Sequence, residues 1–263
     1  RSRGLGDVYK RQDPNKHLLI NVDDLIVADL YVKIHPSKPT VAKIEVNILA
    51  EWRGKGLGEK LLSEALKLLD RSVKKVRIIL SPGNSEILSV AEACGFQVST
   101  TQVDLACDLR ELESVRVPKG CNIKQVTSDQ LEEVTHIRNE AFGTSHRIEE
   151  LQALLRRKDV LTDILVAMVE EKTVGYCISQ IDKRASSREG MIVEIAVRKN
   201  YRGRGIGKAM LLMSLHRLRS KGCRRAVINT QSDNLSALKL YSSVGFKPFK
   251  FKKKILEKSY GNP

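Results

Sequence analysis

The stretch that decides the fold is NYRGRGIGKAMLLMSL, residues 200–215, because the chain carries a second version of it. The earlier version is EWRGKGLGEKLLSEAL, residues 51–66. Each contains an Arg-Gly-x-Gly-x-Gly turn that runs into a segment with apolar residues at helical spacing. The motif arginines, Arg53 and Arg202, are 149 residues apart. The chain therefore repeats at least a strand–turn–helix motif.

The repeat extends well beyond the two turns. A glutamate eight residues before the motif arginine, an asparagine and a Gly-Phe pair all recur at an offset of 149 or 150. They are Glu45 and Glu194, Asn84 and Asn234, and Gly95-Phe96 and Gly245-Phe246. Self-similarity at a fixed offset indicates a repeated structural unit. We therefore predict two tandem domains.

Hydrophobic periodicity predicts an α/β fold with mixed sheets in both domains. Alternating or β-branched apolar runs precede each turn, and helical spacing follows it. The polar segment ESVRVPKG, residues 113–120, is the expected linker because it contains a proline and a glycine. We predict a first domain at 13–112 and a second at 121–260. About 40 residues precede the motif arginine in the first domain and about 81 in the second, so we expect the first to lack a leading strand and two helices.

The first twelve residues, RSRGLGDVYKRQ, need a separate interpretation. The segment DVYKRQ resembles the in-frame translation of a transposon adapter used in sequencing libraries, and the alternative is a short native basic tail. We predict that residues 1–12 are non-native and that the native N-terminus is missing, and we leave them out of the fold prediction.

Composition limits the function classes. The chain of 263 residues is 41% hydrophobic and 29% charged, with no apolar run long enough to span a bilayer and no export leader. Five scattered cysteines and five unclustered histidines favour reduced thiols and a cytoplasmic protein without a metal site. A net charge of +15 indicates anionic partners.

Nucleic acid is one such partner, although it is not favoured. Aromatic residues make up only 5% of the chain, and no recognisable nucleic-acid motif is present. The basic segment FKFKKK, residues 249–254, is the best candidate for such binding. Its alternative interpretation is a solvated edge strand whose lysines discourage aggregation.

The glycine-rich turn suits a phosphate group. Alternating glycines between a strand and a helix let successive backbone N–H groups converge on an anion at the positive end of the helix. The glycine spacing fits neither the dinucleotide fingerprint nor the Walker A loop. The alternative is a glycine-rich connection without a ligand.

The sequence RGRGIG after EIAVRKNY resembles the acetyl-CoA-binding motif of the GNAT N-acetyltransferase superfamily. A companion motif of that family is matched by DNLSALKLYSSVGF, residues 233–246. The resemblance covers residues 121–260 and, without its front, residues 13–112. It implies acetyl-CoA as cosubstrate, no metal, and transfer of the acetyl group to an amine on a small molecule or peptide.

The resemblance also implies roles for individual residues. The cosubstrate would contact the turn, the strand before it and the start of the companion motif; these residues are Ile195, Val197, Arg202, Gly203, Arg204, Gly205, Ile206, Gly207, Lys208 and Asn234. Tyr241 would protonate the departing thiolate, or else be a half-buried packing residue. Glu194 would accept the amine proton directly or through water, or else be a strand carboxylate paired with a cation.

The first domain keeps the glycines but lacks the acid. Aligning Asn84 with Asn234 places Ala91 opposite Tyr241, and alanine cannot donate a proton. We therefore predict that the first domain binds CoA weakly or only packs, and that the second domain catalyses. Activity of both domains and a CoA-binding regulatory pseudoenzyme are the alternatives.

Overall fold

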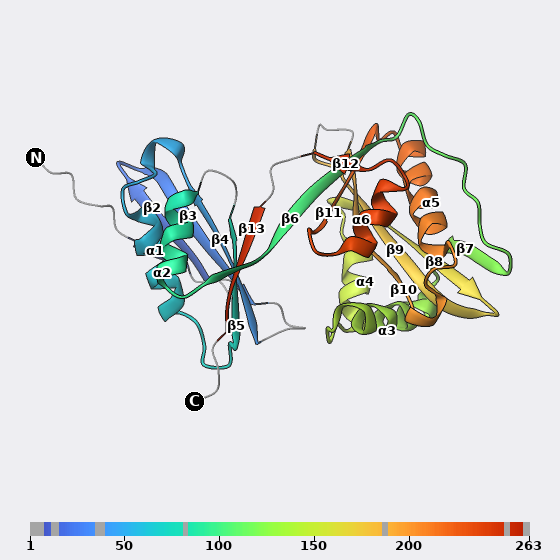
Figure 1. Cartoon of the computed structure of the whole chain (residues 1–263), viewed down its shortest axis with the longest axis horizontal. Helices are drawn as coiled ribbons and strands as arrows, with labels where there is room; N and C mark the ends of the chain where they lie inside the picture. Colours follow the sequence, from blue (N-terminus) through green and yellow to red (C-terminus); the bar gives the residue numbers. More distant parts are fainter. Residues whose placement is uncertain are drawn as a thin grey trace, which may run out of the picture. The chain divides into compact units, whose positions relative to one another are not determined.

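The computed structural model describes residues 8–11, 16–34, 40–80, 84–185, 189–249 and 253–259 (Figure 1). Backbone contacts divide the chain into two compact units. The first comprises Arg1–Gln102 together with Phe251–Pro263, and the second comprises Val103–Lys250.

The first unit is a sheet packed against two helices. Its elements are β1 (Val8–Arg11), β2 (Lys16–Val22), β3 (Leu25–Ile34), β4 (Val41–Ile48), the 3₁₀ turn η1 (Ala50–Trp52), α1 (Leu57–Lys67), β5 (Lys75–Leu80), α2 (Ser85–Ala93), the first half of β6 (Gln97–Asp108) and β13 (Lys253–Ser259). The strand order is β1-β2-β3-β4-β5-β13-β6, with only β4 and β5 parallel. Apolar residues of α1 and α2, including Leu61, Leu62 and Ile87, are buried in one core with these strands.

The second unit is a mixed sheet with helices on both faces. Its elements are the second half of β6, β7 (Cys121–Gln125), η2 (Ser128–Gln130), α3 (Leu131–Phe142), α4 (Ile148–Arg156), β8 (Val160–Val169), β9 (Lys172–Asp182), β10 (Glu189–Val197), η3 (Lys199–Tyr201), α5 (Ile206–Ser220), β11 (Arg225–Gln231), α6 (Leu235–Ser242) and β12 (Lys247–Pro248). The order is β6-β11-β10-β9-β8-β7, and β12 pairs with β6.

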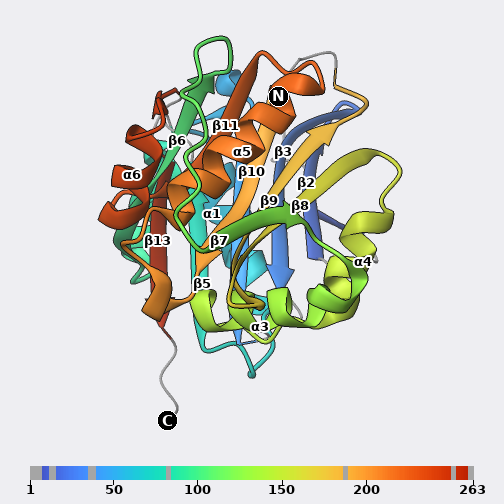
Figure 2. The ribbon, with the colours of Figure 1, turned by 90° about the vertical axis from the view of Figure 1, so that its right-hand side faces the viewer.

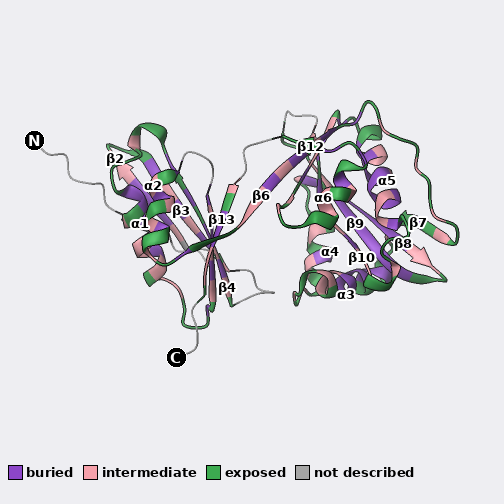
Figure 3. Cartoon of the chain, viewed as in Figure 1, coloured by how far each residue is buried: buried purple, intermediate pink, exposed green. Residues whose placement is uncertain are grey.

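Alternation along the strands separates two cores in the second unit. In β8, Ile164 and Val166 pack with α3 and α4, whereas Leu165 and Ala167 pack with α5 and α6. Successive side chains of a strand point to opposite faces, so each core receives every second residue. Figure 2 shows α5 and the α3–α4 pair in these positions, and Figure 3 shows the buried residues of the strands and of α5.

Strand pairing divides the chain differently from the predicted boundary at 113–120. The chain leaves the first unit within β6, between Gln102 and Val103, and residues 253–259 return to it. There β13 lies between β5 and β6 and pairs with both. The alternative interpretation of residues 249–254 as a solvated edge strand therefore does not hold for Lys253 and Lys254, because both edges of β13 are paired. Residues 250–252 lie outside the described residues.

The predicted linker is docked along α5. The side chain of Glu113 pairs with Lys208 at 2.8 Å, and its carbonyl oxygen contacts His216 Nε2 at 2.8 Å. Val115 packs against the core of the second unit, and Pro118 lies beside Gly205. The segment is thus part of the second unit although its composition is that of a linker.

In both repeats, strands precede the glycine-rich turn and a helix follows it, as the periodicity predicts. No α-helix precedes α1 in the described part of the first unit, whereas α3 and α4 precede the turn of the second. Within the described ranges, no helix is long and apolar enough to cross a membrane. Of the segment 1–12, residues 8–11 pair with β2 as β1, and the rest lies outside the described residues.

Candidate active site

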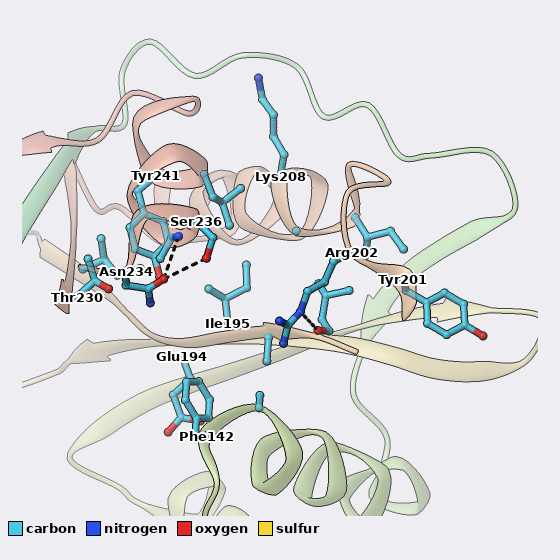
Figure 4. A pocket seen from close by; sticks show the side chains of 18 of the residues that line it. Phe142, Glu194, Ile195, Tyr201, Arg202, Lys208, Thr230, Asn234, Ser236 and Tyr241 are labelled. Atoms are coloured by element: carbon cyan, nitrogen blue, oxygen red, sulfur yellow. Dashed lines mark hydrogen bonds between the residues drawn. The ribbon is translucent and has the colours of Figure 1, made fainter. Parts of the chain in front are cut away.

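A cavity of about 790 Å³ opens in the second unit where two parallel strands separate. The β10–β11 pairing covers Glu189–Met191 and Arg225–Val227 and then ends. Beyond it, residues 193–197 and 228–230 line opposite sides of the cavity, which α5, α6 and the end of α3 complete (Figure 4). A register shift between Ile192 and Glu194 marks a bulge in β10, and bulges redirect side chains beside functional sites.

The glycine-rich turn forms one end of this cavity. Gly203 has a φ of 76° and Gly205 a φ of 79°, a left-handed backbone that side chains with a Cβ rarely adopt. Helix α5 begins at Ile206, directly after the turn. The amides of Gly203 and Gly205 have no acceptor among the described residues. The turn therefore presents N–H groups at a helix N-terminus, an arrangement that binds phosphate.

The basic residues of the turn are largely held by other protein groups. Arg202 Nε donates to the carbonyl oxygen of Val197 at 2.8 Å, which fixes the turn to the end of β10. Arg204 lies over the ring of Tyr201 at 5.2 Å. Arg204 is the one predicted cosubstrate contact that does not line the cavity.

Helix α6 supplies the residues of the companion motif. Asn234 Oδ1 accepts a hydrogen bond from the amide of Ala237 at 3.2 Å and another from Ser236 Oγ at 3.1 Å, so it caps α6 (Figure 4). Tyr241 lines the cavity and is 6% exposed. Burial, with a smaller contribution from Cys177, raises the pKa of Tyr241 to about 12. The phenol therefore keeps its proton at neutral pH.

Glu194 lines the cavity but is tightly paired. Arg138 of α3 binds both carboxylate oxygens, with Nε at 2.9 Å from Oε2 and Nη2 at 2.5 Å from Oε1. The buried Tyr176 hydroxyl donates to Oε2 at 3.0 Å. Burial, followed by the Glu194 charge, raises the pKa of Tyr176 well above its usual range. These contacts correspond to the alternative role given for Glu194, a strand carboxylate paired with a cation.

The sequence analysis missed a second titratable pair on the cavity wall. His146 lines the cavity, and its Nδ1 lies 2.7 Å from Glu150 Oε2. The two residues are four positions apart at the start of α4, a spacing that brings side chains together. That spacing is the only feature of the sequence that could have indicated this pair.

Apart from Arg204, every predicted site residue lines this cavity. They are Glu194, Ile195, Val197, Arg202, Gly203, Gly205, Ile206, Gly207, Lys208, Asn234 and Tyr241. No group of three or more His, Cys, Asp or Glu side chains that could hold a metal ion occurs in the described part of the chain.

The corresponding turn of the first unit is occupied by a side chain. The amides of Gly54 and Gly56 donate to the two carboxylate oxygens of Glu86, at 2.5 and 3.0 Å. Asn84 Oδ1 is buried without a hydrogen-bond partner among the described residues. Ala91, aligned with Tyr241, is fully buried in the core.

Comparison with known proteins agrees with this geometry. Residues 131–246 match the acetyltransferase (GNAT) family, and they include the turn, Asn234 and Tyr241. A mycothiol acetyltransferase of Streptomyces coelicolor is 24% identical over 244 residues, which cover 88% of this chain and 76% of that protein. Residues 131–246 form a domain of the GNAT acetyltransferase family. The protein is accordingly an acyltransferase.

Solved GNAT structures share the fold. A GCN5-related N-acetyltransferase from Sphaerobacter thermophilus superposes with a TM-score of 0.74 at 19% identity and covers 92% of this chain and 80% of that one. A tandem GNAT protein from the clavulanic acid biosynthesis pathway gives a TM-score of 0.71 at 14% identity, covering 95% and 84%. The mixed α/β fold is therefore that of GNAT proteins.

Proposed function

We propose that the chain transfers an acetyl group from acetyl-CoA to a primary amine, and that the cavity of the second unit is the active site. The observation that carries this proposal is one cavity with a phosphate-binding turn at one end and a buried phenol on its wall. Acetyl-CoA supplies the acyl group, and the residues present fit it. The amides of Gly203 and Gly205, which have no acceptor in the part of the chain that the structure describes, suit its pyrophosphate. The separated edges of β10 and β11 suit an extended arm.

On this proposal, Ile195 and Val197 present backbone groups to the arm of the cosubstrate. The Val197 carbonyl already accepts a hydrogen bond from Arg202. The arm of the cosubstrate would therefore contact other atoms of Val197. Lys208 adds positive charge at the turn and is shared with Glu113. Asn234 both caps α6 and lines the cavity.

Tyr241 is the proposed proton donor to the departing sulfur. Its buried phenol holds a proton at neutral pH and lines the same cavity as the turn. Glu194 is the proton acceptor proposed from the sequence. Its bonds to Arg138 and Tyr176 favour a positioning role for it in the wall between β10 and α3.

We also propose that the first unit is a degenerate domain that does not catalyse. Two observations support this: Glu86 occupies its turn, and Ala91 stands where Tyr241 would act.

The test is acetyl-CoA binding by the full chain, measured by titration calorimetry, followed by thiol release with peptide, polyamine and aminoglycoside acceptors. Tyr241→Phe should lower thiol release about 100- to 1000-fold, because it removes the proton donor, while acetyl-CoA binding stays unchanged. Tyr31→Phe, at a partly buried tyrosine on β3 of the first unit, is the matched control. A chain that binds acetyl-CoA but releases no thiol with any acceptor would be a regulatory binding module instead.

A nucleic-acid-binding protein is the remaining alternative, from the net charge of +15. Tight binding of DNA or RNA that weakens steeply with salt would favour it.

A further inference from the structure

The proposed reaction needs a proton acceptor on the cavity wall, because an ammonium group has no lone pair with which to attack a thioester. Among the lining residues that the structure describes, six carry ionisable side chains: His146, Glu194, Tyr201, Arg202, Lys208 and Tyr241. Phenols, guanidinium and ammonium groups hold their protons at neutral pH. Only the imidazole and the carboxylate remain as acceptors.

The carboxylate of Glu194 is poorly placed to accept a proton. Oε1 and Oε2 both bind the Arg138 guanidinium, and Oε2 also accepts the Tyr176 hydroxyl. The Arg138 and Glu194 side chains are only 14% and 19% exposed. Both oxygens thus already accept hydrogen bonds from protein donors, and a proton taken from the substrate amine would have to displace one of them.

The imidazole of His146 contacts a carboxylate rather than a cation. Its side chain is 8% exposed, and Nδ1 lies 2.7 Å from Glu150 Oε2. An ionised carboxylate is only an acceptor, so the contact places a proton on Nδ1 and directs the lone pair of the neutral ring to Nε2.

The backbone around His146 is fixed. Asn139 of α3 donates from Nδ2 to the His146 carbonyl at 3.0 Å, and its Oδ1 accepts the His146 amide at 2.7 Å. The Thr144 hydroxyl donates to the same Oδ1 at 2.9 Å. The ring is therefore held by its backbone and by Glu150, which is the preorganisation that proton transfer requires.

We infer that His146 is the general base of the transfer reaction, with Glu150 as its positioning residue; this inference rests on the proposed function. Nε2 takes one proton from the acceptor ammonium, and the resulting amine attacks the thioester carbonyl carbon. The C–S bond of the thioester then breaks while the new C–N bond remains, and the sulfur takes a proton from Tyr241. The second amine proton restores the Tyr241 phenol, and the imidazolium releases its proton to solvent.

The first test reads the tautomer directly and needs no acceptor. Long-range ¹H–¹⁵N spectra of the full chain at mildly alkaline pH distinguish a ring protonated on Nδ1 from one protonated on Nε2. His146→Gln identifies the signal by its loss. We expect the proton on Nδ1 in the wild type and a mixture of tautomers in Glu150→Gln. A wild-type ring protonated on Nε2 overturns the inference.

The second test is thiol release from acetyl-CoA, with the amine panel and with water alone as acceptor. His146→Gln should lower kcat about 100-fold with acetyl-CoA affinity unchanged, and Glu150→Gln about 10-fold. Exposed His136 on α3 provides the matched control, His136→Gln. Imidazole in solution should partly restore His146→Ala. An unchanged kcat in His146→Gln overturns the inference.

The proposed function and the inference about His146 are contradicted by different results. A wild-type chain that does not bind acetyl-CoA contradicts the proposed function, whereas the tautomer of His146 is still read from the spectra. A chain that binds acetyl-CoA and is slowed by Glu194→Gln but not by His146→Gln keeps the proposed function and assigns the base to Glu194.

Discussion

The two glycine-rich turns share a sequence pattern and a left-handed backbone, yet their surroundings differ. In the first unit, the amides of Gly54 and Gly56 bind the carboxylate of Glu86. In the second unit, Ser236 occupies the position of Glu86, two residues after the aligned asparagine. The same turn thus holds an internal anion in one unit and faces a cavity in the other.

The strands beside the turns differ in the same sense. The β4–β5 pairing runs over five residues and reaches Glu45 and Ile79. The β10–β11 pairing stops at Met191, three residues before Glu194, the counterpart of Glu45. The register between β3 and β4 is continuous, whereas β10 has a bulge. A phosphate-binding motif therefore indicates an anion site, and only the neighbouring strands and side chains show whether a ligand can reach it.

The largest expected difference between the units concerns the paired glutamates. Glu194→Gln should lower the free energy of unfolding by about 3 kcal/mol, because it leaves Arg138 with an uncharged partner in a mostly buried site. Glu45 pairs with Lys43 on the surface, where both side chains are about half exposed. Glu45→Gln should therefore change stability by less than about 0.5 kcal/mol. Urea denaturation measures both, and equal effects would contradict the comparison.

The second prediction concerns a carboxylate introduced into the second unit, at the position that corresponds to Glu86. Ser236→Glu should weaken acetyl-CoA binding about 100-fold, because the new carboxylate competes for the amides of Gly203 and Gly205. Ser242→Glu places the same charge on an exposed position of α6, outside the cavity lining, and is the control. Calorimetric titration of both variants decides this, and equal affinities would show that the turn does not hold the phosphates.

The smallest predicted effect concerns the first unit alone. Glu86→Gln should destabilise the chain by about 1–2 kcal/mol, because the charge-assisted bonds to two backbone amides are weakened. Glu92, exposed on the same helix, gives the control Glu92→Gln. We expect one acetyl-CoA per chain in both variants, since β4 and β5 remain paired. A second bound acetyl-CoA in Glu86→Gln would show that Glu86 alone closes the first unit.

The sequence predicts those features that are local or repeated. Periodicity and glycine spacing predict the strands before each turn, the helix after it and both turns, whereas the resemblance to the GNAT family implies that Tyr241, Asn234 and the glycines share one site. Each of these features depends on a few neighbouring residues, on a comparison of the two repeats or on a family motif.

Contacts between distant segments could not be predicted in this way. Glu86 lies 30 or more residues from the amides it binds, and a glutamate at the start of a helix has many ordinary roles. The pairing of Glu194 with Arg138 joins a strand to a helix 56 residues earlier. His146 and Glu150 have a helical spacing but belong to no recognised motif, and only the fold brings His146 to the cavity.

The position of β13 has a consequence for the order in which the protein is synthesised. β13 lies between β5 and β6, so the sheet of the first unit needs residues 253–259 to close the space between those strands. A ribosome makes the second unit before it makes those residues. The first unit to be translated is therefore the last to complete its sheet, and until then the facing edges of β5 and β6 lack the strand that joins them.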